Sequence, residues 1–133
     1  MKINSYGNLM TCKAVIGINP GYFHNNENSC DDSFFMGYFQ GLLEKYCKEN
    51  DAHLSFVITP ARVVYLSEYG CPPKGEEVYT LESTPDPEYV SVLNVDKWVL
   101  HCKEFISQLA EGLGQSTVRI VFNYSTAFNY GLN

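Results

Sequence analysis

The chain has 133 residues, of which 45% are hydrophobic, 14% aromatic and 18% charged. This composition is typical of a globular protein rather than a disordered one, and the length predicts one domain spanning residues 1–133. The formal net charge of −6 opposes nonspecific binding to nucleic acid or to anionic lipid, so we expect no DNA, RNA or membrane partner.

The cysteines predict free thiols. There are five of them, an odd number, and none forms a Cys-x-x-Cys pair, which argues against a zinc site or a disulfide framework. The N-terminal residues lack the apolar region of a signal peptide, and no stretch is long and apolar enough to span a bilayer. We therefore expect a cytoplasmic protein that needs no metal or other cofactor.

The first half of the chain predicts a strand, a helix and a hairpin. Residues 10–18 alternate as a strand and end at an Asn-Pro-Gly turn. A helix begins at an Asp-Asp pair and runs over about residues 32–49, where aromatic and leucine side chains recur at helical spacing. Residues 53–59 alternate again, the Pro-Ala pair at 60–61 indicates a tight reversal, and residues 62–68 form the returning strand.

The second half predicts a strand, a helix and a last strand. Residues 77–82 read as a strand, whereas the two prolines of residues 84–89 exclude regular structure. A second helix, capped by Asn94, runs to about Glu111 and ends at closely following glycines. Residues 116–124 form the last strand, and the tail after it is weakly patterned.

These elements follow the order β-α-β-β-β-α-β. The order predicts an α+β fold with a single, mostly antiparallel sheet of about five strands and two helices on one face. The last strand would present both polar and apolar side chains on the sheet's other face. Such a face suits a ligand floor or a subunit contact, so we expect a homo-oligomer.

Two irregular loops are candidate ligand-binding segments. In NPGYFHNN, residues 19–26, Tyr22 or Phe23 is suited to stack on a base, and the polar side chains after them, His24, Asn25 and Asn26, to hydrogen-bond a ribose or phosphate. The alternative is a turn whose rings seal the edge of the core. In YGCPPKGEE, residues 69–77, Cys71 is interpreted as part of a shaped turn that packs its thiol.

The two arginines are the candidate phosphate ligands. Arg62 and Arg119 lie on predicted strands, and a guanidinium offers a planar fork of donors to phosphate oxygens. The alternative for each is a surface ion pair with a nearby glutamate. Tyr89 sits on the Pro-framed loop before the second helix, and free backbone N–H groups at that helix start are suited to accept an anion.

No familiar catalytic motif occurs, and His53 and His101 are interpreted as structural residues. The adjacent Glu76 and Glu77 would point to opposite faces of a strand, which is a poor geometry for shared acid–base chemistry.

Four motifs together carry a resemblance to a known family. They are NPGYFH, RVVY followed by EYGCPPKGEE, and QST before the last strand. In order and spacing the chain resembles the phage anti-Thoeris sponge proteins of the first described Thoeris anti-defence family. The resemblance implies a phage-encoded protein of the bacterial cytosol that is not an enzyme. It would bind and sequester cyclic ADP-ribose isomers, as dimers or hexamers, and so block host defence.

The resemblance makes Arg62 and Arg119 phosphate contacts. Combined with the loops above, it predicts a site between protomers, with no catalytic or metal-binding residue. The expected ligand-binding residues are Tyr22, His24, Arg62, Tyr89, Thr117, Arg119 and Asn123. Two alternatives stay open: an enzyme that degrades such a nucleotide signal with His24 or Cys71, and an inhibitor that binds protein through the open sheet face.

Overall fold

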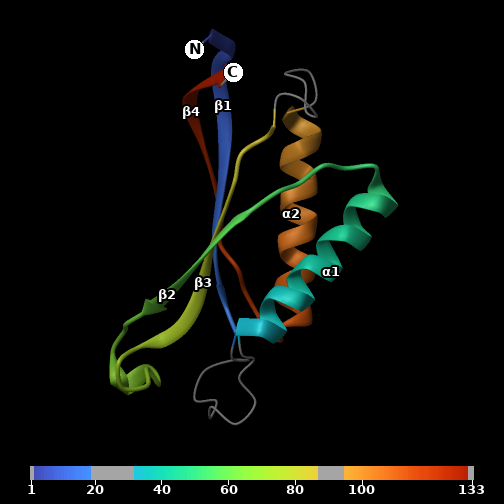
Figure 1. The fold of residues 1–133 in the computed structure, drawn as a ribbon. Coiled ribbons are helices and arrows are strands. Elements are labelled where there is room, and N and C mark those ends of the chain that lie inside the picture. The colour runs from blue at the N-terminus through green and yellow to red at the C-terminus, as the bar shows by residue number, and fades with distance from the viewer. Residues whose placement is uncertain (1, 19–31, 87–94, 132–133) are drawn as a thin grey trace.

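The computed structural model describes residues 2–18, 32–86 and 95–131. Within them the fold is α+β, as predicted: one open antiparallel sheet with two helices on one face (Figure 1). In chain order the elements are β1 Lys2–Gly17, α1 Asp32–Asn50, β2 Val57–Val63, β3 Glu76–Ser83, α2 Val95–Gly112 and β4 Ile120–Gly131. A short 3₁₀ helix, Ser67–Tyr69, lies between β2 and β3.

The described residues form four strands in the order β2-β3-β1-β4, rather than the five expected. The predicted reversal at Pro60 is wrong: β2 continues through it, and Pro60 pairs with Tyr79 of β3. A proline is tolerated here because β2 is an edge strand and its outward side needs no N–H donor. The chain reverses later, and residues 64–68, expected as strand, belong to the connection between β2 and β3.

Both helices occur where the sequence predicts them, because each carries a continuous apolar stripe. The core lies between these stripes and the helix-facing side of β1 and β3. The Phe35 ring of α1 stacks on Tyr79 with a centroid distance of 4.0 Å, and the Tyr79 hydroxyl donates to Asp32 Oδ1 at 2.6 Å. These contacts fix the first turn of α1 against β3.

The last strand is longer than expected. The weakly patterned tail after residue 124 belongs to β4, which pairs antiparallel with β1 from Lys2 to Ala14. Only residues from Cys12 onward in β1 also pair with β3, so β1 and β4 extend beyond the rest of the sheet as a two-stranded arm (Figure 1). The residues of β1 that pair with the tail lie over a hundred positions earlier in the sequence. The pattern of the tail alone therefore could not predict the pairing.

The sheet face opposite the helices is uncovered in Figure 1. It presents apolar side chains that are 40–68% exposed, namely Val15, Val57, Val63 and Val121. Polar residues such as Lys13 and Thr80 lie among them. This mixed surface is the one expected from the last strand's pattern. Neither described helix is both long and apolar enough to cross a membrane.

Candidate active site

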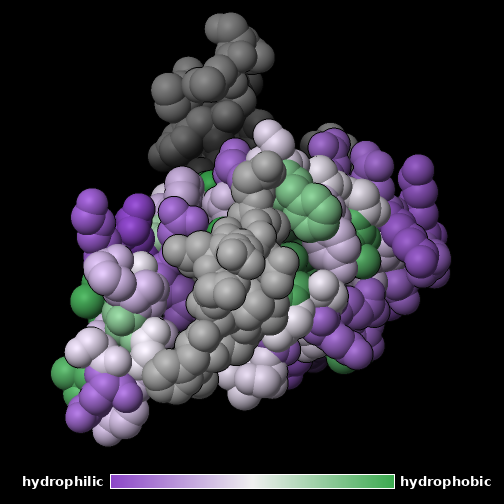
Figure 2. Space-filling model, turned by 90° about the horizontal axis from the view of Figure 1, so that it is seen from below, coloured by the Kyte–Doolittle hydropathy of each residue, from purple (hydrophilic) through white to green (hydrophobic). Residues whose placement is uncertain are grey.

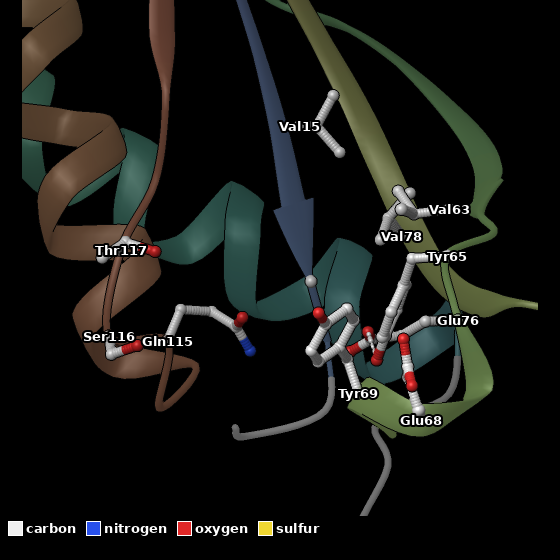
Figure 3. Close-up of a pocket in the computed structure, with 11 residues that line it drawn as sticks. Val15, Val63, Tyr65, Glu68, Tyr69, Glu76, Val78, Gln115, Ser116 and Thr117 are labelled. Carbon is white, nitrogen blue, oxygen red and sulfur yellow. Dashed lines mark hydrogen bonds between the residues drawn. The ribbon is translucent and has the colours of Figure 1, made fainter. Parts of the chain in front are cut away.

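A pocket of about 740 Å³ lies at one end of the uncovered sheet face (Figure 3). One wall is the connection between β2 and β3, and the other is the connection between α2 and β4. The residues that line it are Val15, Gly17, Val63, Tyr65, Glu68, Tyr69, Glu76, Val78, Gln115, Ser116 and Thr117.

The first wall combines carboxylates with phenol rings. The Tyr65 hydroxyl donates to Glu76 Oε2 at 3.2 Å, and Glu68 and Tyr69 lie beside this pair (Figure 3). The backbone N–H of Tyr65 donates to the Cys71 sulfur at 3.4 Å, while that thiol donates to the Pro72 carbonyl. As predicted, Cys71 belongs to a shaped turn, and its thiol holds the backbone of Tyr65.

Residues with positive φ angles shape this turn. They are Gly70, Lys74 and Gly75, at 97°, 72° and 88°. A Cβ atom on Gly75 would lie 2.9 Å from the Val63 carbonyl oxygen, so the position needs glycine for space as well as for backbone angle. The turn brings the start of β3, and therefore Glu76, back beneath Tyr65. Figure 2 shows hydrophilic residues around small hydrophobic patches at the left of the molecule. Val64, in the connection between β2 and β3, is an exposed hydrophobic residue.

The second wall consists of uncharged polar residues. The hydroxyls of Ser116 and Thr117 and the amide of Gln115 line it. The floor between the walls is apolar, formed by Val15, Val63 and Val78. The pocket can therefore hold a cation against carboxylates and aromatic faces at one side, and a hydrogen-bonding group at the other.

The structure distributes the residues predicted from the sequence over different places. Thr117 lines the pocket, and Arg119 lines an adjoining groove on the same face. Arg62 instead lines a separate pocket beside Asp32 and Tyr79. It forms an exposed ion pair with Glu77 at 3.7 Å.

The remaining predicted residues do not join the pocket's described lining. Asn123 is an exposed residue of β4, opposite Thr11 of β1. Tyr22, His24 and Tyr89 lie outside the described residues, so their roles stay predictions.

Sequence reasoning missed the acidic and aromatic wall. It placed Glu76 and Glu77 on opposite faces, as observed: Glu76 lines the pocket and Glu77 meets Arg62. Neither glutamate was predicted as a site residue, because the two were considered only for acid–base chemistry shared between them. One feature of the sequence does indicate this wall: tyrosine and glutamate residues occur on both sides of the aromatic-tipped loop at 69–77.

His101 and the buried Cys102 lie on α2, and the buried Cys12 lies on β1. The Tyr46 hydroxyl lies 2.8 Å from His101 Nδ1 and donates to Glu104 Oε2 at 2.6 Å, which agrees with a structural role for His101. A hydrogen bond with Cys12, and then burial, raise the pKa of the Cys102 thiol, so it stays protonated. In the part of the chain that the structure describes, no three His, Cys, Asp or Glu side chains are grouped to hold a metal ion.

A comparison with protein-family models decides the family. Residues 10–130 match the family described as SAM lyase, where SAM is S-adenosylmethionine. This chain belongs to the SAM lyase family. No curated protein matches the chain.

One solved structure shares the fold of this chain. A phage SAM lyase in complex with S-methyl-5'-thioadenosine superposes with a TM-score of 0.54 at 12% identity, covering 91% of this chain and 90% of that one. At this identity the likeness shows a common fold. A hydantoinase/carbamoylase family amidase from Burkholderia ambifaria covers 96% of this chain but 29% of its own, with a TM-score of 0.43 at 11% identity, and carries no weight.

The SAM lyase match corrects the functional expectations from the sequence. The resemblance to anti-Thoeris sponges is wrong, and so are cyclic ADP-ribose sequestration and a non-enzymatic role, because the family is one of lyases. The alternative of an enzyme that degrades a cyclic nucleotide is also wrong about the substrate, because the family is named for S-adenosylmethionine. The motifs misled because each is short, and the Gly- and Pro-containing ones specify only a tight turn, which does not identify a fold.

Proposed function

We propose that this chain is an enzyme that cleaves S-adenosylmethionine and that the pocket beside Tyr65 and Glu76 is its active site. The observation that carries the proposal is the family match across residues 10–130. The structural neighbour with S-methyl-5'-thioadenosine supports a nucleoside thioether as one product. A small nucleotide-like ligand was also expected from the sequence.

The chemistry follows from comparing substrate with product. S-methyl-5'-thioadenosine keeps the methyl group and the ribose C5' on sulfur, so the bond that breaks joins sulfur to Cγ of the methionyl chain. Its electron pair stays on sulfur, which becomes a neutral thioether. A lyase adds no water. The substrate's own carboxylate attacks Cγ, closing a five-membered ring, and the four-carbon fragment leaves as homoserine lactone.

The carboxylate wall suits the cationic part of this substrate. Glu76, held by the Tyr65 hydroxyl at 3.2 Å, and Glu68 would bind the ammonium or sulfonium charge. The Tyr69 ring, 62% exposed, offers a π face to the same cation or to the base. The valine floor would keep water from the sulfonium, which favours ring closure over hydrolysis.

The charge of the whole chain fits this substrate better than an anionic one. S-adenosylmethionine carries two positive charges and one negative, whereas the chain's formal net charge is −6. Long-range attraction therefore assists capture, where it would have opposed a cyclic nucleotide.

Among the residues predicted from the sequence, Thr117 lines the pocket, and its hydroxyl is our candidate for binding a ribose hydroxyl. Arg119, in the adjoining groove, is a candidate for holding the substrate carboxylate.

Self-association through the uncovered sheet face and action in the cytosol of a bacterial host stay predictions. Light scattering of the purified protein, with Val121→Glu as the disrupting variant, measures the first.

The test is incubation with S-adenosylmethionine, followed by mass spectrometry of the products at early times in ¹⁸O-labelled water. We expect S-methyl-5'-thioadenosine and unlabelled homoserine lactone, formed faster than in buffer alone. Homoserine labelled from the first time point indicates hydrolysis instead. 2-Aminobut-3-enoate, an isomer of the lactone that separates from it by chromatography, indicates elimination. Unchanged substrate contradicts the proposal.

A further inference from the structure

We propose that Gln115 is the residue that selects adenine, by pairing its side-chain amide with the base edge while Tyr69 stacks on the base face. This inference rests on the proposed function, since it concerns the nucleoside half of the same substrate. Three features support it: the backbone position of Gln115 at the end of α2, the contact of its side chain with Gly17, and the difference in charge between the two walls of the pocket.

The C-terminus of α2 fixes the backbone of Gln115. The Gln115 N–H donates to the Ala110 carbonyl at 2.9 Å, and the Gly114 N–H donates to the Glu111 carbonyl at 3.0 Å. With Gly114 at a φ of 74°, these two bonds form a Schellman motif. The residue after the glycine therefore leaves the helix in a set direction, toward the sheet end that carries the pocket.

Gly17, the last residue of β1, leaves the space that the side-chain amide of Gln115 occupies. A Cβ atom at position 17 would lie 2.8 Å from Gln115 Oε1, 3.2 Å from Cδ and 3.4 Å from Nε2. The whole amide thus lies flat against a position that has room for it only because it is glycine. Figure 3 shows this amide directed across the pocket toward Tyr69.

The two sides of the pocket differ in charge, which assigns the two halves of the substrate. Glu68 and Glu76 lie on the side of the β2–β3 connection, where the cationic methionyl sulfonium belongs. The side of Gln115 carries only uncharged donors and acceptors among its described residues, which suits an uncharged nucleoside. Tyr69 faces Gln115 across the space between.

An amide matches adenine in a way that it does not match hypoxanthine. On its N7 edge adenine presents the N6 amino donor beside the N7 acceptor, and a glutamine amide pairs with both through its oxygen and its NH₂ group. Hypoxanthine has an oxygen in place of the amino group, so on this edge it presents two acceptors, and the amide can pair with only one of them in either orientation. A bidentate pair of this kind discriminates by about 5- to 150-fold.

The experiment measures dissociation constants by calorimetry for S-methyl-5'-thioadenosine and its hypoxanthine analogue, 5'-methylthioinosine. We expect the native protein to prefer the adenine compound by about 5- to 150-fold. Gln115→Ala should reduce the preference to about twofold or less, by weakening adenine binding. Gly17→Ala, which keeps Gln115 but pushes its amide from its place, should reduce it in the same direction. Gln108→Ala, at an exposed position on α2, is the matched control and should keep the preference.

The outcomes separate the two proposals. If the native protein binds S-methyl-5'-thioadenosine but Gln115→Ala keeps the native preference, the assignment of Gln115 is wrong and the proposed function stands. Equal native affinity for both bases also overturns the assignment alone. If the native protein binds neither nucleoside, the assignment falls together with the proposed site. Circular dichroism of both pocket variants establishes that they are folded.

Discussion

The hydroxyl of Tyr65 donates a 3.2 Å hydrogen bond to Oε2 of Glu76, joining a residue just beyond β2 to the first residue of β3. The bond links the two ends of the connection between these strands, and both residues line the pocket. It also orients a carboxylate toward the space where the proposed substrate carries its positive charge.

Replacing Glu76 tests this pair. We expect Glu76→Gln to lower kcat/KM for S-adenosylmethionine by about 10- to 150-fold, because a hydrogen bond to a charged group contributes roughly 1.5–3 kcal/mol. Glu77→Gln is the matched control: its side chain points away from the pocket to an exposed contact with Arg62, so the change should stay within about twofold. Equal losses in both variants would refute a specific role for Glu76.

Salt should separate the charged substrate from the neutral product. Because attraction between the acidic chain and a cation is screened within about 10 Å at 0.1 M salt, kcat/KM should fall as ionic strength rises. Binding of uncharged S-methyl-5'-thioadenosine, measured by calorimetry over the same range, should change little. A kcat/KM that rises with salt would speak against electrostatic capture.

The turn that carries Glu76 into place should be sensitive at Gly75. We expect Gly75→Ala to lower the free energy of unfolding by about 1–3 kcal/mol, because alanine would be strained at a φ of 88° and close to the Val63 carbonyl. Gly41→Ala, in α1 with open space around it, should instead raise it by about 0.5–1 kcal/mol. Urea denaturation measures both, and a neutral Gly75→Ala would contradict the strained turn.

How much of this arrangement the sequence predicts depends on how local its determinants are. Both helices were predictable because their apolar stripes lie within single segments. The run of β2 through Pro60 was not, since only the strand's place at the sheet edge makes that proline acceptable. The length of β4 depends on β1, whose pairing residues lie at the other end of the chain.

The site was harder to predict for the same reason. Tyr65 and Glu76 are 11 residues apart and meet only because three positive φ angles shape the turn between them. Lys74 is one of the residues with a positive φ angle, and a lysine in a sequence does not predict that backbone conformation. Gln115 was visible in the QST motif, but its contact with Gly17 requires the docking of α2 on β1.

Alkaline pH should weaken the contact between the helices at Tyr46. Burial, and then the hydrogen bond to Glu104, raise the pKa of the Tyr46 phenol in the folded protein above its ordinary value of 10.0. The folded state therefore holds the proton longer than the unfolded state does. The resulting stabilisation is complete below pH 10 and is lost as pH rises from there toward the folded-state pKa.

Tyr46→Phe isolates this effect from the other tyrosines. The difference in unfolding free energy between the native protein and Tyr46→Phe should be constant below about pH 9 and then decline, by at most about 1.4 kcal/mol per pH unit. Guanidinium denaturation across pH 8–11 measures it. A difference that does not change with pH would mean that Tyr46 ionises equally in both states.

The most direct test of the account follows the sulfur methyl group by NMR, using S-adenosylmethionine labelled with ¹³C at that carbon. The account predicts that the sulfonium methyl signal is replaced, in equal amount, by the thioether methyl signal of S-methyl-5'-thioadenosine, and that Glu76→Gln slows this change while Glu77→Gln does not. A sulfonium signal that persists as long as in buffer alone, or a label that leaves the sulfur, would contradict it.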